Sequence, residues 1–394
     1  MFTLLLCNLS ILGRPPVGND VLSWKTPIRS GNCRPHTPIH SVHVLAAMLA
    51  LGIFGAGPAQ AQFIIDGTSL TVPPPLGNSP NADLIVGNST TGALTVQNGG
   101  TVTDLRGFIA ALSGSSGTVT VTGPGSTWTN NGQELLVGDF GTGTLTVQNG
   151  GRVSDVTGFI AGFSVSSGTV TVTDPGSTWA NNGVLVVADA GTGTLTVQNG
   201  GTVTDTRGLI GNVSGSSGTV AVTGAGSTWT NSADLSVGGP GTGTLTIQTG
   251  GTVISSNGII GGNGSSGTVM VAGPGSTWTD NGYLLVADGG TGTLTIQNGG
   301  TVSDTRGVIG NVSGSSGTVA VTGAGSTWTN SADLSVGGPG NRYTDHPERR
   351  HGVGCRWHGV GCRWRDRRSQ RLLGHGDGDW PRLDLDKQWL SFGC

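Results

Sequence analysis

Apolar and polar residues alternate in short runs along most of this chain. Around Leu94 and Val96, and again around Val119 and Val121, the apolar residues are separated by Thr. Alternation with a period of two is typical of a β-strand with one buried face. The runs are only about three to six residues long, and Gly pairs or Asn-Gly close them. The pattern predicts an all-β chain of short strands joined by glycine-rich corners.

The alternating runs belong to a tandem repeat with a period of about 50 residues. One phrase, G-T-L-T-V-Q-N-G-G-T-V, is followed by a second, S-S-G-T-V-T-V-T-G-P-G-S-T-W, and the pair occurs five times with small changes. The leucine of the first phrase recurs at Leu94, Leu145, Leu195, Leu245 and Leu294. The two halves resemble each other, so the structural unit is about 25 residues long. We therefore predict a right-handed parallel β-helix with two rungs per repeat, taking the handedness from the strand-crossover rule.

Charge is scarce in the repeats, and its sign excludes some partners. Between residues 62 and 340 there are four Arg and no Lys, against thirteen Asp and one Glu. This acidic body argues against nucleic acid and against anionic membrane surfaces as partners. The same residues contain no Cys, so no disulfide framework is expected.

The start of the chain has the pattern of an export signal. An apolar stretch at residues 44–56 follows Lys25, Arg29 and Arg34, and Ala-Gln-Ala at 59–61 offers a cleavage site before Gln62. The alternative is a transmembrane anchor, but the stretch is shorter than the roughly 20 residues that a span needs. We expect a leader with a signal peptide at 1–61, a lead-in at 62–83, and no transmembrane segment in the mature chain.

The double phrase resembles the repeat of type V secretion (autotransporter) passengers and of PEP-CTERM-associated surface proteins. The resemblance covers residues 84–340. It implies an adhesin-like passenger at the cell surface, on the outer membrane or outside the cell, whose partners are host or matrix surfaces or glycans. It also implies a C-terminal translocator barrel. Residues 341–394 show neither amphipathic barrel strands nor a Pro-Glu-Pro sorting segment, so we expect a truncated passenger.

The last 54 residues look like the repeat read in another frame. A one-base shift in DNA that encodes G-T-G-T-L-T-I-Q-N-G-G-T-V gives N-R-Y-T-D-H-P-E-R-R-H-G, the sequence of residues 341–352. We therefore expect a disordered tail at 341–394. His351, Cys355, His358 and Cys362 have a spacing that could suit zinc, and residues 363–368 form a basic patch, but both fall in this segment and we expect no metal or nucleic-acid site there. An uncovered last rung then favours end-to-end self-association.

Candidate sites within the repeats are few. Asp104, Asp155, Asp205 and Asp304 recur at one position, where they either cap a backbone N–H in a turn or supply the separated carboxylates of an inverting glycosidase. No His lies between His43 and His346, which excludes a Ser-His-Asp relay in the body. The repeat tryptophans form either a packed ladder or an exposed track that contacts glycans or another surface: Trp128, Trp179, Trp229, Trp278 and Trp328.

Three functions remain open from the sequence. The first is a structural and adhesive surface rod, with no catalytic, cofactor-binding or metal site. The second is a polysaccharide-active β-helix enzyme, which would need an irregular rung with clustered acids and a basic residue. The third is a passenger fragment without a present function.

Overall fold

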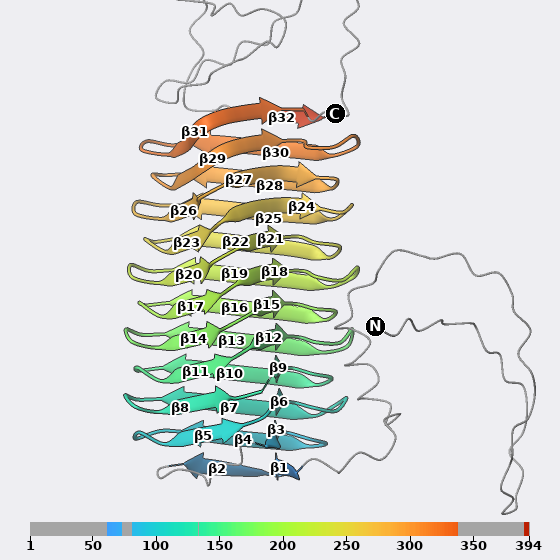
Figure 1. Cartoon of the computed structure of the whole chain (residues 1–394), viewed down its shortest axis with the longest axis vertical. Helices are drawn as coiled ribbons and strands as arrows, with labels where there is room; N and C mark the ends of the chain where they lie inside the picture. The colour runs from blue at the N-terminus through green and yellow to red at the C-terminus, as the bar shows by residue number, and fades with distance from the viewer. Residues whose placement is uncertain (1–60, 73–80, 133, 338–389, 394) are drawn as a thin grey trace, which may run out of the picture. The chain divides into compact units, whose positions relative to one another are not determined.

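The chain folds as a parallel β-solenoid. The computed structural model describes residues 61–72, 81–132, 134–337 and 390–393, and within them there are strands and turns but no helix. About 11 turns of about 25 residues each stack one above the next, from β1 and β2 at one end to β31 at the other (Figure 1). The all-β coil with two rungs per repeat is therefore confirmed, while its handedness stays a prediction. No described helix is long and apolar enough to cross a membrane.

One side of every turn belongs to a 12-stranded sheet. Its strands pair in parallel, except that the last, β32, runs antiparallel to β30. They are β2 (Thr68–Val72), β4 (Thr91–Val96), β7 (Ser116–Thr122), β10 (Thr142–Gln148), β13 (Ser167–Thr173), β16 (Thr192–Gln198), β19 (Ser217–Thr223), β22 (Thr242–Gln248), β25 (Ser266–Ala272), β28 (Thr291–Gln297), β30 (Ser316–Thr322) and β32 (Leu390–Gly393).

The other strands of the turns, two short ones in most of them, belong to a 20-stranded sheet. The first set is β5 (Thr101–Asp104), β8 (Thr127–Asn130), β11 (Arg152–Asp155), β14 (Thr178–Asn181), β17 (Thr202–Asp205), β20 (Thr228–Asn231), β23 (Thr252–Ser255) and β26 (Thr277–Asp280). The second set is β1 (Ala61–Ile65), β3 (Ala82–Val86), β6 (Gly107–Ile109), β9 (Glu134–Val137), β12 (Thr157–Ile160), β15 (Val184–Val187), β18 (Arg207–Ile210), β21 (Asp234–Val237), β24 (Asn257–Gly262) and β27 (Tyr283–Asp288). Near the C-terminal end, β29 (Thr301–Ile309) and β31 (Thr327–Val336) each span both sets.

The corners use the residues that the sequence offers for them. Asn149 has a φ of 53° and Gly150 a φ of 84°, so the Asn-Gly pair turns the chain through the left-handed region. The serine of G-S-T-W is also a corner residue. Ser177 Oγ accepts a hydrogen bond from the Gly150 N–H at 2.9 Å, one rung below. This bond joins successive rungs in all five copies, the others being Ser126 to Gly99, Ser227 to Gly200, Ser276 to Gly250 and Ser326 to Gly299.

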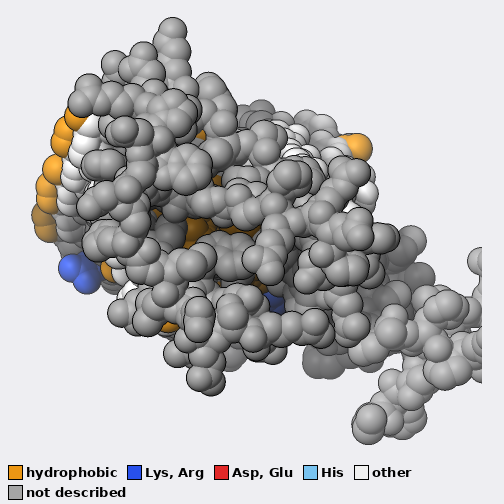
Figure 2. Space-filling model, turned by 90° about the horizontal axis from the view of Figure 1, so that it is seen from above, with side chains coloured by type: hydrophobic (Ala, Val, Ile, Leu, Met, Phe, Trp, Pro, Cys, Tyr) orange, Lys and Arg blue, Asp and Glu red, His pale blue; other side chains and the backbone are white. Residues whose placement is uncertain are grey.

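The interior is one continuous apolar core. Leu, Val, Ile and Trp side chains from all three strands of each turn fill it from Ile65 to Trp328. A smaller cluster lies on the outer face of the second strand set, where Leu136, Phe159 and Val186 stack in register. In the view from above, apolar side chains gather along one edge (Figure 2).

Both ends of the solenoid differ from the expected boundaries. The first turn, β1 and β2, already lies in the stretch expected to be a lead-in, because β1 pairs with β3 and β2 with β4. Residues 390–393, expected to be disordered, form β32 and cover the outer edge of β30, so at that strand the expected open edge is corrected. Of the leader expected at 1–61, residues 1–60 lie outside the described residues, as do the tail residues 341–389 with the zinc-like and basic motifs.

Candidate functional site

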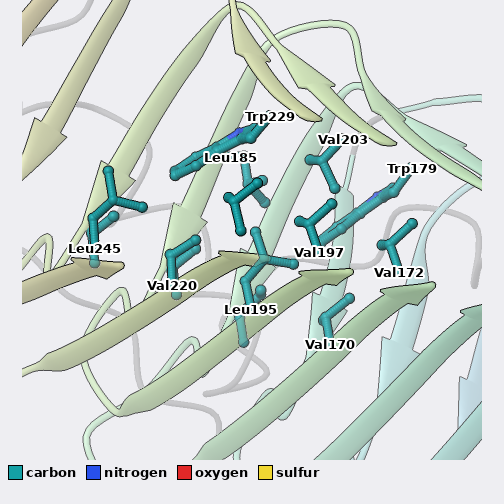
Figure 3. Packing of buried hydrophobic residues seen from close by; sticks show 14 of the residues in the cluster. Val170, Val172, Trp179, Leu185, Leu195, Val197, Val203, Val220, Trp229 and Leu245 are labelled. Atoms are coloured by element: carbon teal, nitrogen blue, oxygen red, sulfur yellow. The ribbon is translucent and has the colours of Figure 1, made fainter. Parts of the chain in front are cut away.

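Inside the coil, tryptophan alternates with valine from one rung to the next. Trp179 lies in register between Val153 below and Val203 above, and the same order holds through all five repeats. The ring of each repeat tryptophan is buried, with exposed fractions of 0% at Trp128, Trp179, Trp229 and Trp278 and 5% at Trp328. Trp179 and Trp229 are seen inside the coil with Val203 between them (Figure 3).

The tryptophans therefore form the packed ladder and not the exposed track. A glycan or another surface would have to contact an indole face, and these faces pack against neighbouring rungs. The surface-contact alternative for Trp128, Trp179, Trp229, Trp278 and Trp328 is corrected by this burial.

Each of these indoles donates a hydrogen bond to a buried side chain one rung below. Trp128 Nε1 donates to Asp104 Oδ2 at 2.6 Å, and Trp179 Nε1 to Asp155 Oδ2 at the same distance. The bond recurs from Trp229 to Asp205 at 2.6 Å and from Trp328 to Asp304 at 2.5 Å. The recurring aspartates are thus partners of the tryptophans. Neither of the predicted roles, a turn cap or a glycosidase carboxylate, fits side chains that are 2–5% exposed.

Burial changes the protonation of this carboxyl column. Desolvation raises the pKa of Asp104 and of Asp205 to about 7, although the tryptophan hydrogen bond opposes the shift. Desolvation raises the pKa of Asp155 to about 8, against the hydrogen bond from Trp179 and with a smaller contribution from Asp104. The Oδ1 atoms of all three are buried and accept no hydrogen bond. A neutral carboxyl suits such a place, because a buried charge without compensating bonds is costly.

The fourth repeat keeps the carboxyl but moves it to the next rung. In the other repeats an aspartate lies in register with an asparagine, as Asp205 does with Asn231. In the fourth, Ser255 replaces the aspartate and Asp280 replaces the asparagine. Trp278 Nε1 donates to Ser255 Oγ at 3.0 Å, and Ser255 Oγ donates in turn to Asp280 Oδ1. Each repeat therefore buries one carboxyl group at this level.

A second acidic group surrounds Arg106 near the N-terminal end, on the outer face. The Arg106 guanidinium donates to both oxygens of Asp83, at 3.0 and 2.5 Å, and lies 5.3 Å from the centre of the Phe108 ring. Desolvation, then Glu134, raises the pKa of Asp139 to about 7, while Arg106 opposes the shift. Desolvation also raises the pKa of Glu134. The repeat pattern did not predict this group. The one signal in the sequence was Glu134, which is the single Glu between residues 62 and 340.

A groove near the C-terminal end has a volume of about 640 Å³. Its lining includes Tyr283, Leu285, Asp288, Arg306 and Asn311. Asn311 Nδ2 donates to Asp288 Oδ1 at 2.7 Å, so the one acid of this lining is engaged with its neighbour. Among the described residues there is also no group of three or more His, Cys, Asp or Glu that could hold a metal ion.

Similarity to a known protein is found among solved structures. No family model matches the chain, and no curated protein matches it. Among solved structures, a crystal structure of a TibC-catalyzed hyper-glycosylated TibA55-350 fragment is similar at 17% identity, covering 71% of this chain and 93% of that one, with a TM-score of 0.31.

Proposed function

We propose that this chain is the β-helical passenger of a secreted or surface-displayed protein, with a structural and adhesive role. The observation that carries the proposal is the continuity of the coil. Parallel pairing runs from β1 and β2 to β30 and β31, and where β29 and β31 span both strand sets the register shifts between Asp304 and Arg306. A long uniform rod holds its outer side chains at fixed spacing over many turns. This is what a spacer or a multivalent contact surface requires.

The sequence supports the same proposal in two further ways. The repeat resembles that of autotransporter passengers, and the apolar stretch at 44–56 with Ala-Gln-Ala at 59–61 has the pattern of an export signal. The ligand class that we propose is a host or matrix surface.

A polysaccharide-active enzyme is the second candidate, and the group around Arg106 is the observation that favours it. Asp139 and Glu134 both have a raised pKa, and the charge of Arg106, which pairs with Asp83, opposes both shifts. Perturbed acids beside a basic residue are a known mark of catalytic sites. The stronger reading for Arg106 and Asp83 is structural, because their bidentate bond ties β3 to the turn above.

Export and adhesion can be tested together. The full chain is produced in an export-competent bacterium beside an Ala61→Lys variant, whose cleavage site is blocked. We expect the mature wild-type protein to begin at Gln62 by mass spectrometry and to lie outside the cytoplasm. Beads coated with it should be retained on immobilised matrix proteins more than uncoated beads. A chain that stays in the cytoplasm with residues 1–61 attached would contradict export, and beads that are not retained would contradict adhesion.

A further inference from the structure

One face of the rod is a regular array of hydroxyl side chains. It is formed by the outward residues of β4 to β30 in the 12-stranded sheet, and we call it the threonine face. Its two central columns hold a Thr-x-Thr pair on six rungs, at 118 and 120, 144 and 146, 169 and 171, 194 and 196, 244 and 246, and 293 and 295. Four of these rungs, β7 to β16, are consecutive. Ala221, Met270 and Ala320 interrupt one column further along.

The columns are straight because the register does not shift. Thr118 pairs with Thr144, Thr144 with Thr169, and Thr169 with Thr194, always one strand apart. Neighbouring strands lie about 4.8 Å apart, and two residues along a strand span about 6.7 Å. The threonines therefore form a two-dimensional lattice whose two repeat distances are these spacings.

The threonine face carries no charge. Its outward residues from β4 to β30 are Thr, Ser, Gln, Ala and Met, whereas Asp, Glu and Arg side chains occur on the 20-stranded sheet and at corners. The central threonines are half-buried or exposed, and within the described residues no side-chain hydrogen bond engages their hydroxyls. These hydroxyls are therefore available to order water.

We propose that the threonine face binds ice. The two repeats of the lattice are close to the two oxygen repeats of the prism face of hexagonal ice. Each threonine offers a hydroxyl that bonds a water molecule and a methyl group that holds the next water in place. Because neutral rows leave no ion whose hydration shell must be removed, ordered surface water can join the crystal without a desolvation cost.

The same observations favour ice over a polysaccharide. Sugar rings are commonly held by stacking on aromatic faces. The threonine face has no aromatic residue, and the five repeat tryptophans are buried. Binding to ice goes beyond the proposed passenger function, since it depends on the folded rod alone and not on export or on a host ligand.

The test uses the purified full chain and two single-residue variants. Thr169→Arg places a charge in the middle of the threonine face, where Thr169 is exposed. Thr204→Arg is the matched control, because Thr204 is exposed in β17 of the 20-stranded sheet. Thermal hysteresis, ice-crystal shape and inhibition of ice recrystallisation are measured for all three. Circular dichroism and thermal melting confirm that each is folded.

We expect the wild type and Thr204→Arg to shape ice equally. Thr169→Arg should lose roughly tenfold in hysteresis, because a guanidinium at the contact has no partner in ice. A folded wild type that leaves ice crystals unshaped would overturn the proposal, as would equal activity in both variants. Retention on crystalline cellulose without any effect on ice would assign the face to a polysaccharide and would also overturn it. None of these results depends on whether the chain is exported.

Discussion

At the residue scale, the chemistry of this protein is concentrated in the buried Asp–Trp pairs. The sequence could predict that the tryptophans pack as a ladder, because they recur at one rung position. It could not show that Asp155 and Trp179 meet, since they are 24 residues apart and the pairing depends on the register between rungs. One signal was available: Ser255 and Asp280 depart from the repeat in the same copy, as contacting residues do when one change compensates another.

The fourth repeat allows a direct test of this compensation. Ser255→Asp alone would place two buried carboxyl groups in register, because Asp280 lies opposite. We expect the free energy of unfolding to fall by about 2 kcal/mol, because a second buried carboxyl group adds polar atoms without hydrogen-bond partners. Ser255→Asp combined with Asp280→Asn recreates the pair of the other four repeats and should recover most of the loss. Urea unfolding of both single variants and the double variant measures the coupling. Additive effects would contradict the compensation.

At the scale of the strand, the two rungs of a repeat differ because the interior must fit an indole. The buried position of the second strand set alternates between Gly and Leu, as at Gly208 and Leu235. A Cβ on Gly208 would lie 2.2 Å from Asn231 Oδ1 and 2.8 Å from Trp229 Cζ2, so the glycine makes room for the ring. The alternating runs and Asn-Gly corners were predictable, since both are local patterns. The Gly–Trp fit was not, because it joins residues of different rungs.

Gly208→Ala tests this fit. The added methyl group overpacks a core that has no free space, and we expect a loss of about 2 kcal/mol in the free energy of unfolding. Gly162→Ala is the control, because the nearest atom to its added Cβ would be 3.5 Å away. Urea midpoints of both variants should differ clearly from each other. Equal midpoints would mean that the alternation of the rungs has another cause.

At the scale of the whole molecule, the period of the sequence was enough to predict a rod with one core. Turns of about 25 residues stack without a break because each buries its apolar face only against its neighbours. The boundaries were less predictable, since β1, β2 and β32 lie outside the clear repeats. Each repeat also contributes one buried carboxyl group. The effects of their ionisation on the free energy of unfolding therefore add along the rod.

This column makes the stability of the rod depend on pH. The folded pKa of Asp104 and of Asp205 is about 7 and that of Asp155 about 8, all above the ordinary value of 3.8. Their stabilising contribution is therefore complete below pH 3.8 and is lost as the pH rises through 7 to 8, since the unfolded chain ionises first. We expect the free energy of unfolding, measured by urea denaturation, to fall between pH 4 and pH 8 by roughly 4 kcal/mol per carboxyl.

A triple variant separates this effect from general repulsion in an acidic rod. Asn at positions 104, 155 and 205 cannot ionise but still accepts the indole hydrogen bond, so Asp→Asn at all three should flatten the fall and make the rod more stable than the wild type at pH 8. Asp333→Asn removes the same charge per residue at an exposed site of β31 and serves as the control for net charge. If the triple variant loses stability with pH as steeply as the wild type, the buried column is not the cause. A wild-type midpoint that rises from pH 4 to pH 8 would contradict the raised pKa values themselves, because the sign of the linkage follows from them alone.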